Sequence, residues 1–213
     1  MVVPEHAMDD DGVGSWSPMK RQEARRAMLR GALAIGVGLP LLDLCARLAP
    51  EVSAQGEPRN QRPQAGDRFA FQAGERAGQL ITVADLPMGG PPVAAYPMDP
   101  TSGVVRDGSR LNQILLVRLP DADLSEETRA RSADGVVAYS GVCTHTGCDI
   151  TLWKAEMRRF RCPCHESEFD PKDAGRVVGG PAPRRLPRVP VRVVDGVPVA
   201  AAGFLGRPGF QTG

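Results

Sequence analysis

The sequence predicts an all-β protein built from antiparallel strands that many loops connect. Glycine and proline are abundant, with 24 and 20 residues in a chain of 213, whereas aromatic residues make up only 5%. This composition is typical of a loop-rich β protein rather than of a helical bundle. Near the C-terminus, Asp195-Gly196 separates two short β-branched runs. This pair favours the tight turn of a β-hairpin, because it readily adopts positive φ angles.

Short apolar and β-branched runs bounded by turn residues indicate where the other strands lie. In chain order, the predicted strands lie at 69–71, 79–83, 114–119, 136–139, 150–153, 157–161, 191–194 and 197–200. Residues 87–110 are rich in Pro, Gly and Asp and are expected to form turns. One short helix is expected within 121–133, where Ser125 suits the N-cap and acidic residues follow it in the first turn.

The first 54 residues have the pattern of an export signal. Arg25-Arg26 precedes an uncharged run at 31–42, and Val52-Ser53-Ala54 offers a small-residue cleavage site. Paired arginines are typical of the bacterial twin-arginine route. That route carries folded proteins, which suits a protein whose cofactor is inserted in the cytoplasm. We therefore expect a location in the bacterial periplasm.

The same N-terminal segment leaves a membrane anchor as the alternative. A spanning helix needs about 20 mainly apolar residues, whereas the uncharged run contains Pro40 and ends before Asp43. Cleavage is therefore favoured, and the protein is expected to be either soluble or held at the inner membrane. Residues 55–66 are polar and interrupted by Pro and Gly, which predicts a linker before a domain at 67–213.

Two short boxes of cysteine and histidine contain the candidate metal ligands. The boxes read Cys143-Thr-His145-Thr-Gly-Cys148 and Cys162-Pro-Cys164-His165-Glu-Ser167. Every cysteine and histidine beyond residue 54 lies inside them. Each box therefore offers one thiolate and one imidazole to a metal, and each contains one further cysteine.

Two kinds of metal centre use two thiolates together with two imidazoles. Zinc binds this set tetrahedrally, whereas a Rieske [2Fe–2S] centre binds one iron through two Cys and the other through two His. The further cysteine in each box favours the cluster, because a zinc site has no need of it. Zinc remains the alternative.

Over residues 143–170 the chain resembles Rieske iron–sulfur proteins, and a less specific resemblance extends over about 67–205. The resemblance implies an antiparallel β fold with a small cluster-binding subdomain inserted at about 137–184. It also implies one Rieske-type [2Fe–2S] cluster per chain. In such a protein Cys143 and Cys162 would bind the inner iron, and His145 and His165 the outer, solvent-facing iron.

The resemblance gives roles to further residues around the boxes. Cys148 and Cys164 would form a disulfide between the two loops, and Ser167 would donate a hydrogen bond to the cluster. The segment 179–183 is similar to the proline-rich loop that covers such clusters. Phe169 stands where the members with the highest reduction potentials have a tyrosine that donates to a cysteine sulfur. Because phenylalanine cannot donate, we expect a positive but intermediate potential.

The resemblance implies an electron-transfer subunit of a cytochrome bc-type quinol–cytochrome c oxidoreductase, which passes electrons one at a time from quinol to a c-type cytochrome. Ser167, the implied disulfide, the twin-arginine signal and the polar linker favour this assignment. Thr146, Glu166 and Phe169 depart from the residues usual in such subunits. In that case cytochrome b and its quinol site would be the redox partner, and the N-terminal segment would make membrane contact possible.

The alternative is a soluble periplasmic subunit similar to the small subunit of arsenite oxidase. Its redox partner would be a molybdenum-bearing catalytic subunit, and the run at 167–170 fits this class. Nucleic acid is not an expected partner, because 26 basic residues nearly balance 25 acidic ones and no basic stripe occurs. The sequence offers no substrate site of its own, so the chain is expected to relay electrons within a larger oxidoreductase.

Overall fold

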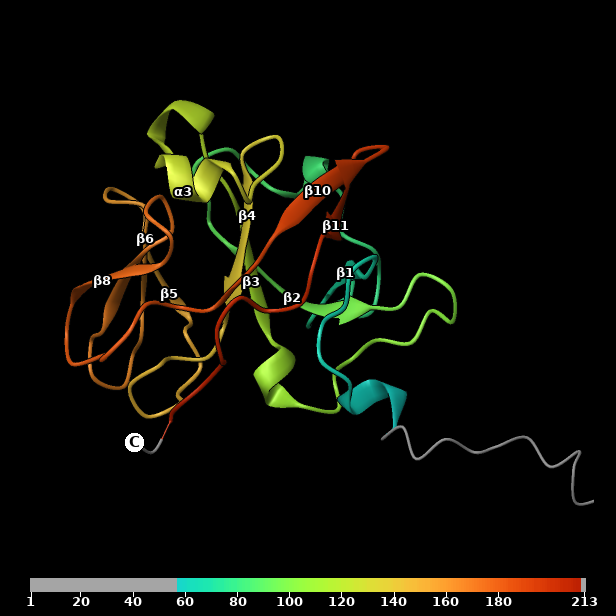
Figure 1. Cartoon of the computed structure of the whole chain (residues 1–213), viewed down its shortest axis with the longest axis horizontal. Coiled ribbons are helices and arrows are strands. Elements are labelled where there is room, and N and C mark those ends of the chain that lie inside the picture. Colours follow the sequence, from blue (N-terminus) through green and yellow to red (C-terminus); the bar gives the residue numbers. More distant parts are fainter. Residues whose placement is uncertain (1–56, 212–213) are drawn as a thin grey trace, which may run out of the picture. The chain divides into compact units, whose positions relative to one another are not determined.

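The computed structural model describes residues 57–211, and almost all of its regular structure is antiparallel β-sheet (Figure 1). The strands form one seven-stranded sheet and one four-stranded sheet. The predicted all-β class is therefore confirmed. The predicted export signal at 1–54 lies outside the described residues. Within residues 57–211, no helix is both long enough and apolar enough to cross a membrane.

The seven-stranded sheet forms the base of the fold, with the strand order β10-β11-β1-β2-β3-β4-β9. Its strands are β1 (Arg68–Phe71), β2 (Val93–Met98), β3 (Ile114–Arg118), β4 (Val136–Ser140), β9 (Arg188–Val189), β10 (Val191–Val194) and β11 (Val197–Ala200). All neighbouring pairs are antiparallel. The predicted hairpin at the C-terminal side is confirmed as β10 and β11, with Asp195 and Gly196 at φ angles of 51° and 74°.

The four-stranded sheet follows β4 in the chain and precedes β9, so it is inserted into the base sheet. Its strands, in spatial order, are β5 (Leu152–Lys154), β6 (Arg159–Arg161), β7 (Glu168–Asp170) and β8 (Arg176–Gly179). This arrangement agrees with the predicted inserted subdomain. In Figure 1 these strands form a separate group beside β4.

The helical segments within residues 57–211 are single turns. They are η2 (Pro58–Asn60), η3 (Val83–Asp85), η4 (Arg110–Asn112), η5 (Asp121–Asp123) and α3 (Glu126–Arg129). The helix predicted within 121–133 is thus only partly formed. Ser125 does cap α3, since its hydroxyl accepts a hydrogen bond from the Thr128 N–H at 3.3 Å. The chain is extended at Ser125, whose N–H instead donates to the Lys172 carbonyl, and this separates η5 from α3.

Two of the predicted elements are corrected by the structure. The strand predicted at 79–83 is reduced to one antiparallel bridge between Leu80 and Ala70 of β1. The chain then bends into η3, where the Asp85 carboxylate accepts hydrogen bonds from the backbone and hydroxyl of Thr82. Residues 93–98, expected to be turns, form β2. Pro97 argued against a strand here, because proline is usually excluded from central strands. The proline is tolerated because β2 pairs with β3 only over Val93–Ala95.

The buried residues form two clusters on the two faces of β3. Leu115 and Val117 pack into a cluster that includes Phe160 and Phe169 of the inserted sheet. The alternate residues of β3, among them Leu116, pack into a second cluster under the base sheet. Side chains alternate between the faces of a strand, so β3 contributes to both cores. This shared packing positions the inserted sheet against the base.

Residues just before β1 lie against the domain through a buried ion pair. The guanidinium of Arg106 donates to both carboxylate oxygens of Asp67 at 2.8 and 3.0 Å, and both side chains are only 2% exposed. Arg106 also donates to the Gln61 side chain at 2.7 Å. The described part of the predicted linker at 55–66 is therefore held by specific hydrogen bonds.

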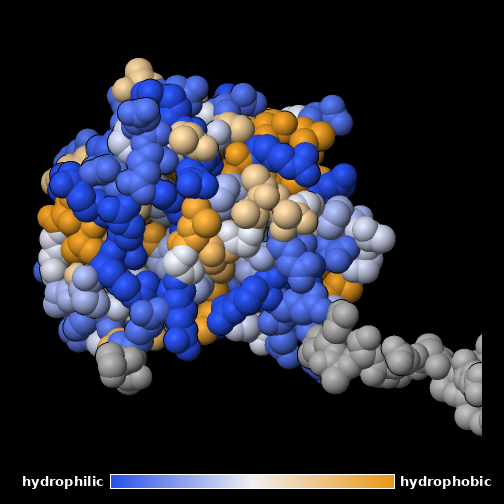
Figure 2. Space-filling view, viewed as in Figure 1, coloured by the Kyte–Doolittle hydropathy of each residue, from blue (hydrophilic) through white to orange (hydrophobic). Residues whose placement is uncertain are grey.

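Hydrophilic residues dominate the face of the molecule seen in Figure 2, and hydrophobic residues occur there in small groups. Among the described residues, the large hydrophobic side chains that are exposed are Met88, Leu152, Met157, Val194, Leu205 and Phe210.

Candidate metal centre

The two boxes form two loops with the same hydrogen-bonding pattern. In the first, the N–H of Gly147 donates to the carbonyl of Cys143 at 3.1 Å. In the second, the N–H of Glu166 donates to the carbonyl of Cys162 at the same distance. Gly147 and Glu166 also share a left-handed backbone, with φ of 82° and 60°. Each loop therefore turns sharply after its first cysteine, although only the first has a glycine at the turn.

The two histidines meet at the ends of these loops. The Nδ1 atoms of His145 and His165 lie 3.3 Å apart, and the ring planes are at 90° to each other. Two nitrogen donors on one tetrahedral ion, each about 2.1 Å from it, lie about 3.4 Å apart. The observed separation therefore fits two imidazoles that bind one ion. His145 is half-buried and His165 is exposed, so this side of the centre faces solvent.

The two thiols lie in the core below the histidines. Cys143 and Cys162 are 0% and 1% exposed, and both are free. Burial raises the pKa of the Cys143 thiol, and the adjacent Cys162 also raises it. The His145 N–H, 3.5 Å from the Cys143 sulfur, and the Ser167 hydroxyl act in the opposite direction. The pKa of Cys143 is raised overall, and the two donors offset part of the rise by stabilising the thiolate, the form in which cysteine binds metal.

The remaining two cysteines of the boxes are joined to each other. Cys148 and Cys164 form a disulfide with a Cα–Cα distance of 6.6 Å, and it links the two loops. The sulfurs of Cys148, Cys162 and Cys164 lie within 4.8 Å of one another. Because two of these sulfurs already form the disulfide, this group is not a second metal site.

A third segment, between β8 and β9, contacts both boxes. The N–H of Ala182 donates to the Ser167 hydroxyl at 3.1 Å. The hydroxyl of Thr144 donates to the carbonyl of Arg184 at 2.6 Å. Gly180 passes so close to the second box that a β-carbon on it would lie 2.5 Å from the Cα of Ser167. The segment therefore covers the centre on a third side, as the resemblance implied for 179–183.

Two residues build this arrangement in ways that the sequence did not indicate: Thr144 was not singled out, and Gly180 was predicted only as part of the covering segment. Thr144 stands between Cys143 and His145, is fully buried, and links the first box to the third segment. Gly180 permits the close approach to the second box. Thr144 gave no signal in the sequence, because a threonine in a loop is ordinarily a surface residue. Phe169 is also fully buried, in the same cluster as Cys143 and Cys162.

The donor set fits a Rieske cluster better than a zinc ion. Two buried thiols lie on the protein side and two imidazoles on the solvent side. This segregation matches a centre in which one iron takes two sulfurs from the protein and the other takes two nitrogens. The hydroxyl of Ser167 and the N–H of His145 lie on the sulfur side, where donors stabilise negative charge.

Comparison with known proteins agrees with this geometry. The family model of the Rieske [2Fe-2S] domain matches residues 98–190. The cytochrome bc1 complex Rieske iron–sulfur subunit of Corynebacterium diphtheriae is 38% identical over 100 residues, which are 44% of this chain and 25% of that protein. The corresponding subunit of Streptomyces lividans is 38% identical over 96 residues, 45% of this chain and 56% of that protein.

Another relative is named as a respiratory nitrate reductase Rieske subunit, from Haloferax mediterranei. It is 39% identical over 106 residues, which cover 49% of this chain and 47% of that protein. This chain thus spans about a quarter to a half of the length of these curated relatives. Among solved structures, a chain of a hyperthermophilic respiratory Complex III matches 86% of this chain and 100% of its own length, with 24% identity and a TM-score of 0.40.

The matched family model includes both boxes, and the residues of those boxes meet in the structure at one centre. The chain therefore contains a Rieske [2Fe–2S] domain, whose cofactor is a Rieske-type iron–sulfur cluster.

Proposed function

We propose that Cys143, His145, Cys162 and His165 hold one Rieske [2Fe–2S] cluster, and that the chain is the electron-transfer subunit of a cytochrome bc-type complex. The observation that carries the proposal is the pair of imidazoles at the solvent-facing side, with Nδ1 atoms 3.3 Å apart above two buried thiols. When bound, the cluster accepts and releases one electron at a time. A partner would reach this centre through the exposed His165.

The residues around the thiols would set the reduction potential. The Ser167 hydroxyl and the His145 N–H stabilise negative charge at the Cys143 sulfur. Donors to sulfur favour the reduced state of an iron–sulfur cluster, which carries one more negative charge. Phe169 offers no such donor, although it lies in the core cluster that contains both thiols. We therefore infer a positive, intermediate potential.

The disulfide and the covering segment would protect the buried side of the centre from water. The Cys148–Cys164 disulfide links the two box loops, and the segment containing Ala182 hydrogen-bonds to the second box. The loops are thus held on three sides while the imidazoles stay accessible. This arrangement suits an electron relay, which needs a rigid centre that undergoes little reorganisation and an accessible edge for the partner.

Quinol as donor and a c-type cytochrome as acceptor belong to this proposal. They are supported by the relatives from Corynebacterium diphtheriae and Streptomyces lividans, which are named as subunits of the cytochrome bc1 complex. We further infer export through the twin-arginine route to the periplasm from the pattern of residues 1–54. A molybdenum oxidoreductase is the second candidate, and the relative from Haloferax mediterranei, named for a nitrate reductase, favours it.

The cluster is tested by metal and sulfide analysis together with electron paramagnetic resonance of the reduced protein. We expect two irons and two acid-labile sulfides per chain, and a signal that disappears in His165→Ala. Thr146→Ala is the matched control, since Thr146 is an exposed residue of the first loop whose side chain offers no nitrogen ligand. A single zinc per chain, with no signal after reduction, would contradict the proposal.

The assignment to a complex is tested by isolating the native protein from membrane and periplasmic fractions and measuring its intact mass. Co-purification with a b-type cytochrome from the membrane, together with reduction of the cluster by quinol, would support the bc-type complex. A chain that begins near Gln55 in the soluble fraction, bound to a molybdenum-containing subunit, would instead support the second candidate.

A further inference from the structure

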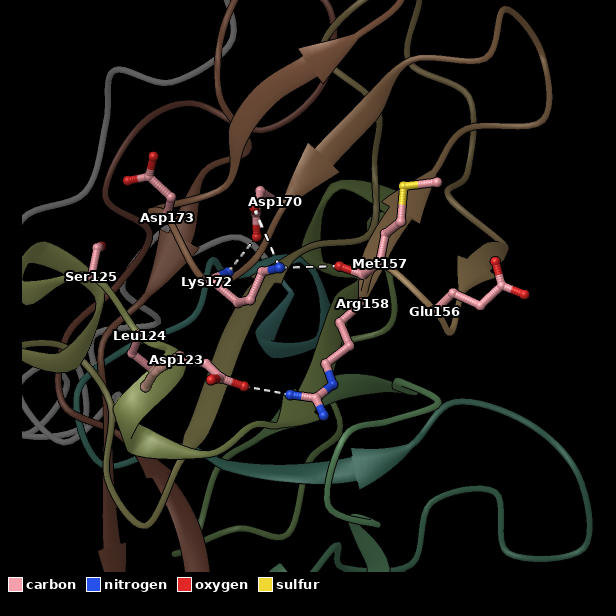
Figure 3. Close-up of a pocket in the computed structure, with 9 residues that line it drawn as sticks. All are labelled: Asp123, Leu124, Ser125, Glu156, Met157, Arg158, Asp170, Lys172 and Asp173. Atoms are coloured by element: carbon pink, nitrogen blue, oxygen red, sulfur yellow. Dashed lines mark hydrogen bonds and ion pairs between the residues drawn. The ribbon is translucent and has the colours of Figure 1, made fainter.

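Two surface hollows in the described part of the chain differ in how their charges are paired. The larger one, about 570 Å³, lies beside η5 and the turn between β5 and β6 (Figure 3). Each of its cations contacts a carboxylate, since Arg158 pairs with Asp123 and Lys172 with Asp170. These contacts leave no excess of positive charge there, so this hollow offers no clear site for a ligand.

The second hollow, about 300 Å³, lies between two chain segments that run antiparallel beside the metal centre. Arg188 and Leu205 exchange backbone hydrogen bonds at 3.2 and 2.7 Å, which fixes the segments at one end. The Arg184 guanidinium donates to the carbonyl of Gly209 and closes the other end. The two segments are therefore held together at both ends of the hollow, and a volume of this size lies at the small end of ligand pockets.

The lining of this hollow combines apolar surface with cations. Leu205 is the exposed apolar residue of the wall, next to the largely buried Leu186 and Pro187, and Arg184, Arg185 and Arg207 provide the charge. Among the described residues, no carboxylate lines the hollow. Within residues 57–211, neither Arg184 nor Arg207 forms an ion pair.

The cations of the hollow also repel one another. Burial lowers the pKa of Arg184, and the positive charge of Arg207 lowers it further. The pKa of Arg62 is also lowered, mainly by burial and further by the positive charge of Arg207. Arg185, which also lines the hollow, is instead paired with Glu127 at 3.0 Å. A bound anion would relieve the repulsion between Arg184 and Arg207 by pairing with them, as Glu127 pairs with Arg185.

We propose that this hollow binds an organic carboxylate that carries an apolar chain. The carboxylate would contact the guanidinium groups of Arg184 and Arg207, which match its planar shape. The apolar chain would lie against Leu205 and the edge of Pro187. Such a group can come from a free carboxylic acid or from a carboxylate-bearing segment of a partner subunit. The proposal concerns this site alone and does not depend on the function proposed above.

The hollow lies next to the metal centre through one direct contact. The carbonyl of Arg184 accepts the hydrogen bond of Thr144, which stands between Cys143 and His145. A ligand that contacts the Arg184 side chain would therefore be separated from the first box by Arg184 alone. This places an occupant of the hollow close to the surface that a redox partner would approach.

The site is tested by calorimetric titration of the full holo-protein with hexanoate. We expect saturable binding of one hexanoate per chain, weaker binding of acetate, which lacks the apolar chain, and no binding of 1-hexanol, which lacks the charge. Binding should also weaken as the salt concentration rises. Absence of hexanoate binding, or equal binding of 1-hexanol, would overturn the proposal.

Two substitutions separate a specific contact from a general effect of charge. Arg207→Gln should weaken hexanoate binding about threefold to fivefold, the effect expected for one ion pair near the surface. Arg192→Gln removes the same charge from an exposed position on β10 outside the hollow, and it should leave the affinity unchanged. Equal affinities in wild type and Arg207→Gln, or equal losses in both variants, would disprove the assignment.

Two further measurements distinguish the sources of the carboxylate. Native mass spectrometry of the isolated chain would detect a small carboxylic acid that stays bound through purification. Release of the chain from its native complex by hexanoate, but not by 1-hexanol, would identify a carboxylate of a partner subunit. Both outcomes support the site, and they assign it to different occupants.

Discussion

Gly180 lies so close to Ser167 that a β-carbon at position 180 would stand 2.5 Å from the Ser167 Cα and 2.7 Å from its backbone nitrogen. Gly180 also has a φ of 77°, which disfavours any residue with a side chain. The segment that covers the metal centre can therefore contact the second box only because residue 180 is glycine. The neighbouring Gly179 has no such constraint, since its added β-carbon would lie 3.7 Å from the nearest atom.

Gly180→Ala is therefore expected to destabilise both the fold and the cluster. The left-handed backbone alone costs about 1–3 kcal/mol for a residue other than glycine, and the clash with Ser167 adds to this. Thermal unfolding and the rate of loss of cluster absorbance measure the two effects. Gly179→Ala is the matched control and should behave like wild type. Similar melting temperatures for the two variants would argue against the close approach.

Removal of the disulfide is expected to lower stability without removing any proposed ligand. Cys148 and Cys164 are 16 positions apart, and a crosslink that closes a loop of this length stabilises by about 3 kcal/mol. The variant with both cysteines replaced by serine should melt about 6–12 °C lower, from about 2–4 °C per kcal/mol. A reductant should lower the melting temperature of wild type only. If it lowers both proteins equally, the disulfide is not the cause.

A hydroxyl at position 169 is expected to raise the reduction potential. Phe169 is fully buried in the core that contains Cys143 and Cys162, and a donor there would stabilise the reduced cluster. One hydrogen bond of about 1 kcal/mol corresponds to about 40 mV for a one-electron couple. Protein-film voltammetry of Phe169→Tyr measures the shift. Phe69→Tyr makes the same change in the other core and should leave the potential unchanged.

The Asp85 carboxylate is expected to stabilise the folded protein at neutral pH and to lose this effect in acid. A hydrogen bond from Arg76, at 2.7 Å, is the main cause that lowers the pKa of Asp85 to about 2, and hydrogen bonds from Thr82 add to it. A carboxyl group with a lowered pKa in the folded state stabilises fully above its unfolded pKa of about 4. That contribution is lost as the pH falls from about 4 to 2, because both states then become protonated.

Urea unfolding at a series of pH values tests this prediction. The difference in unfolding free energy between wild type and Asp85→Asn should be largest at neutral pH and should shrink between pH about 4 and 2. Glu75→Gln is the control, since Glu75 is exposed. A wild-type advantage that persists at pH about 2 would show that the Asp85 carboxylate is not responsible.

Local signals predicted the elements whose shape depends on adjacent residues. The hairpin of β10 and β11 followed from Asp195-Gly196, and β3 followed from its uninterrupted apolar run. The predictions failed where contacts between residues far apart in the sequence decide the local structure. β2 contains Pro97 and is formed by pairing with β1 and β3. The strand expected at 79–83 shrinks to one bridge at Leu80, and the chain then bends into η3, where Asp85 accepts a hydrogen bond from the Thr82 backbone.

The sequence by itself determined the donor types, since a domain whose two histidines both lie within the cysteine-containing boxes offers few other ligands. It also determined the strand-rich class, because short runs and turn residues act locally. Only the tertiary structure decided that Thr144 and Gly180 hold the covering segment against the two boxes. The tertiary structure alone also brought Arg184 and Arg207 to one hollow. Such contacts join residues far apart in the chain, and they depend on how the inserted sheet packs against β3, which no local pattern encodes.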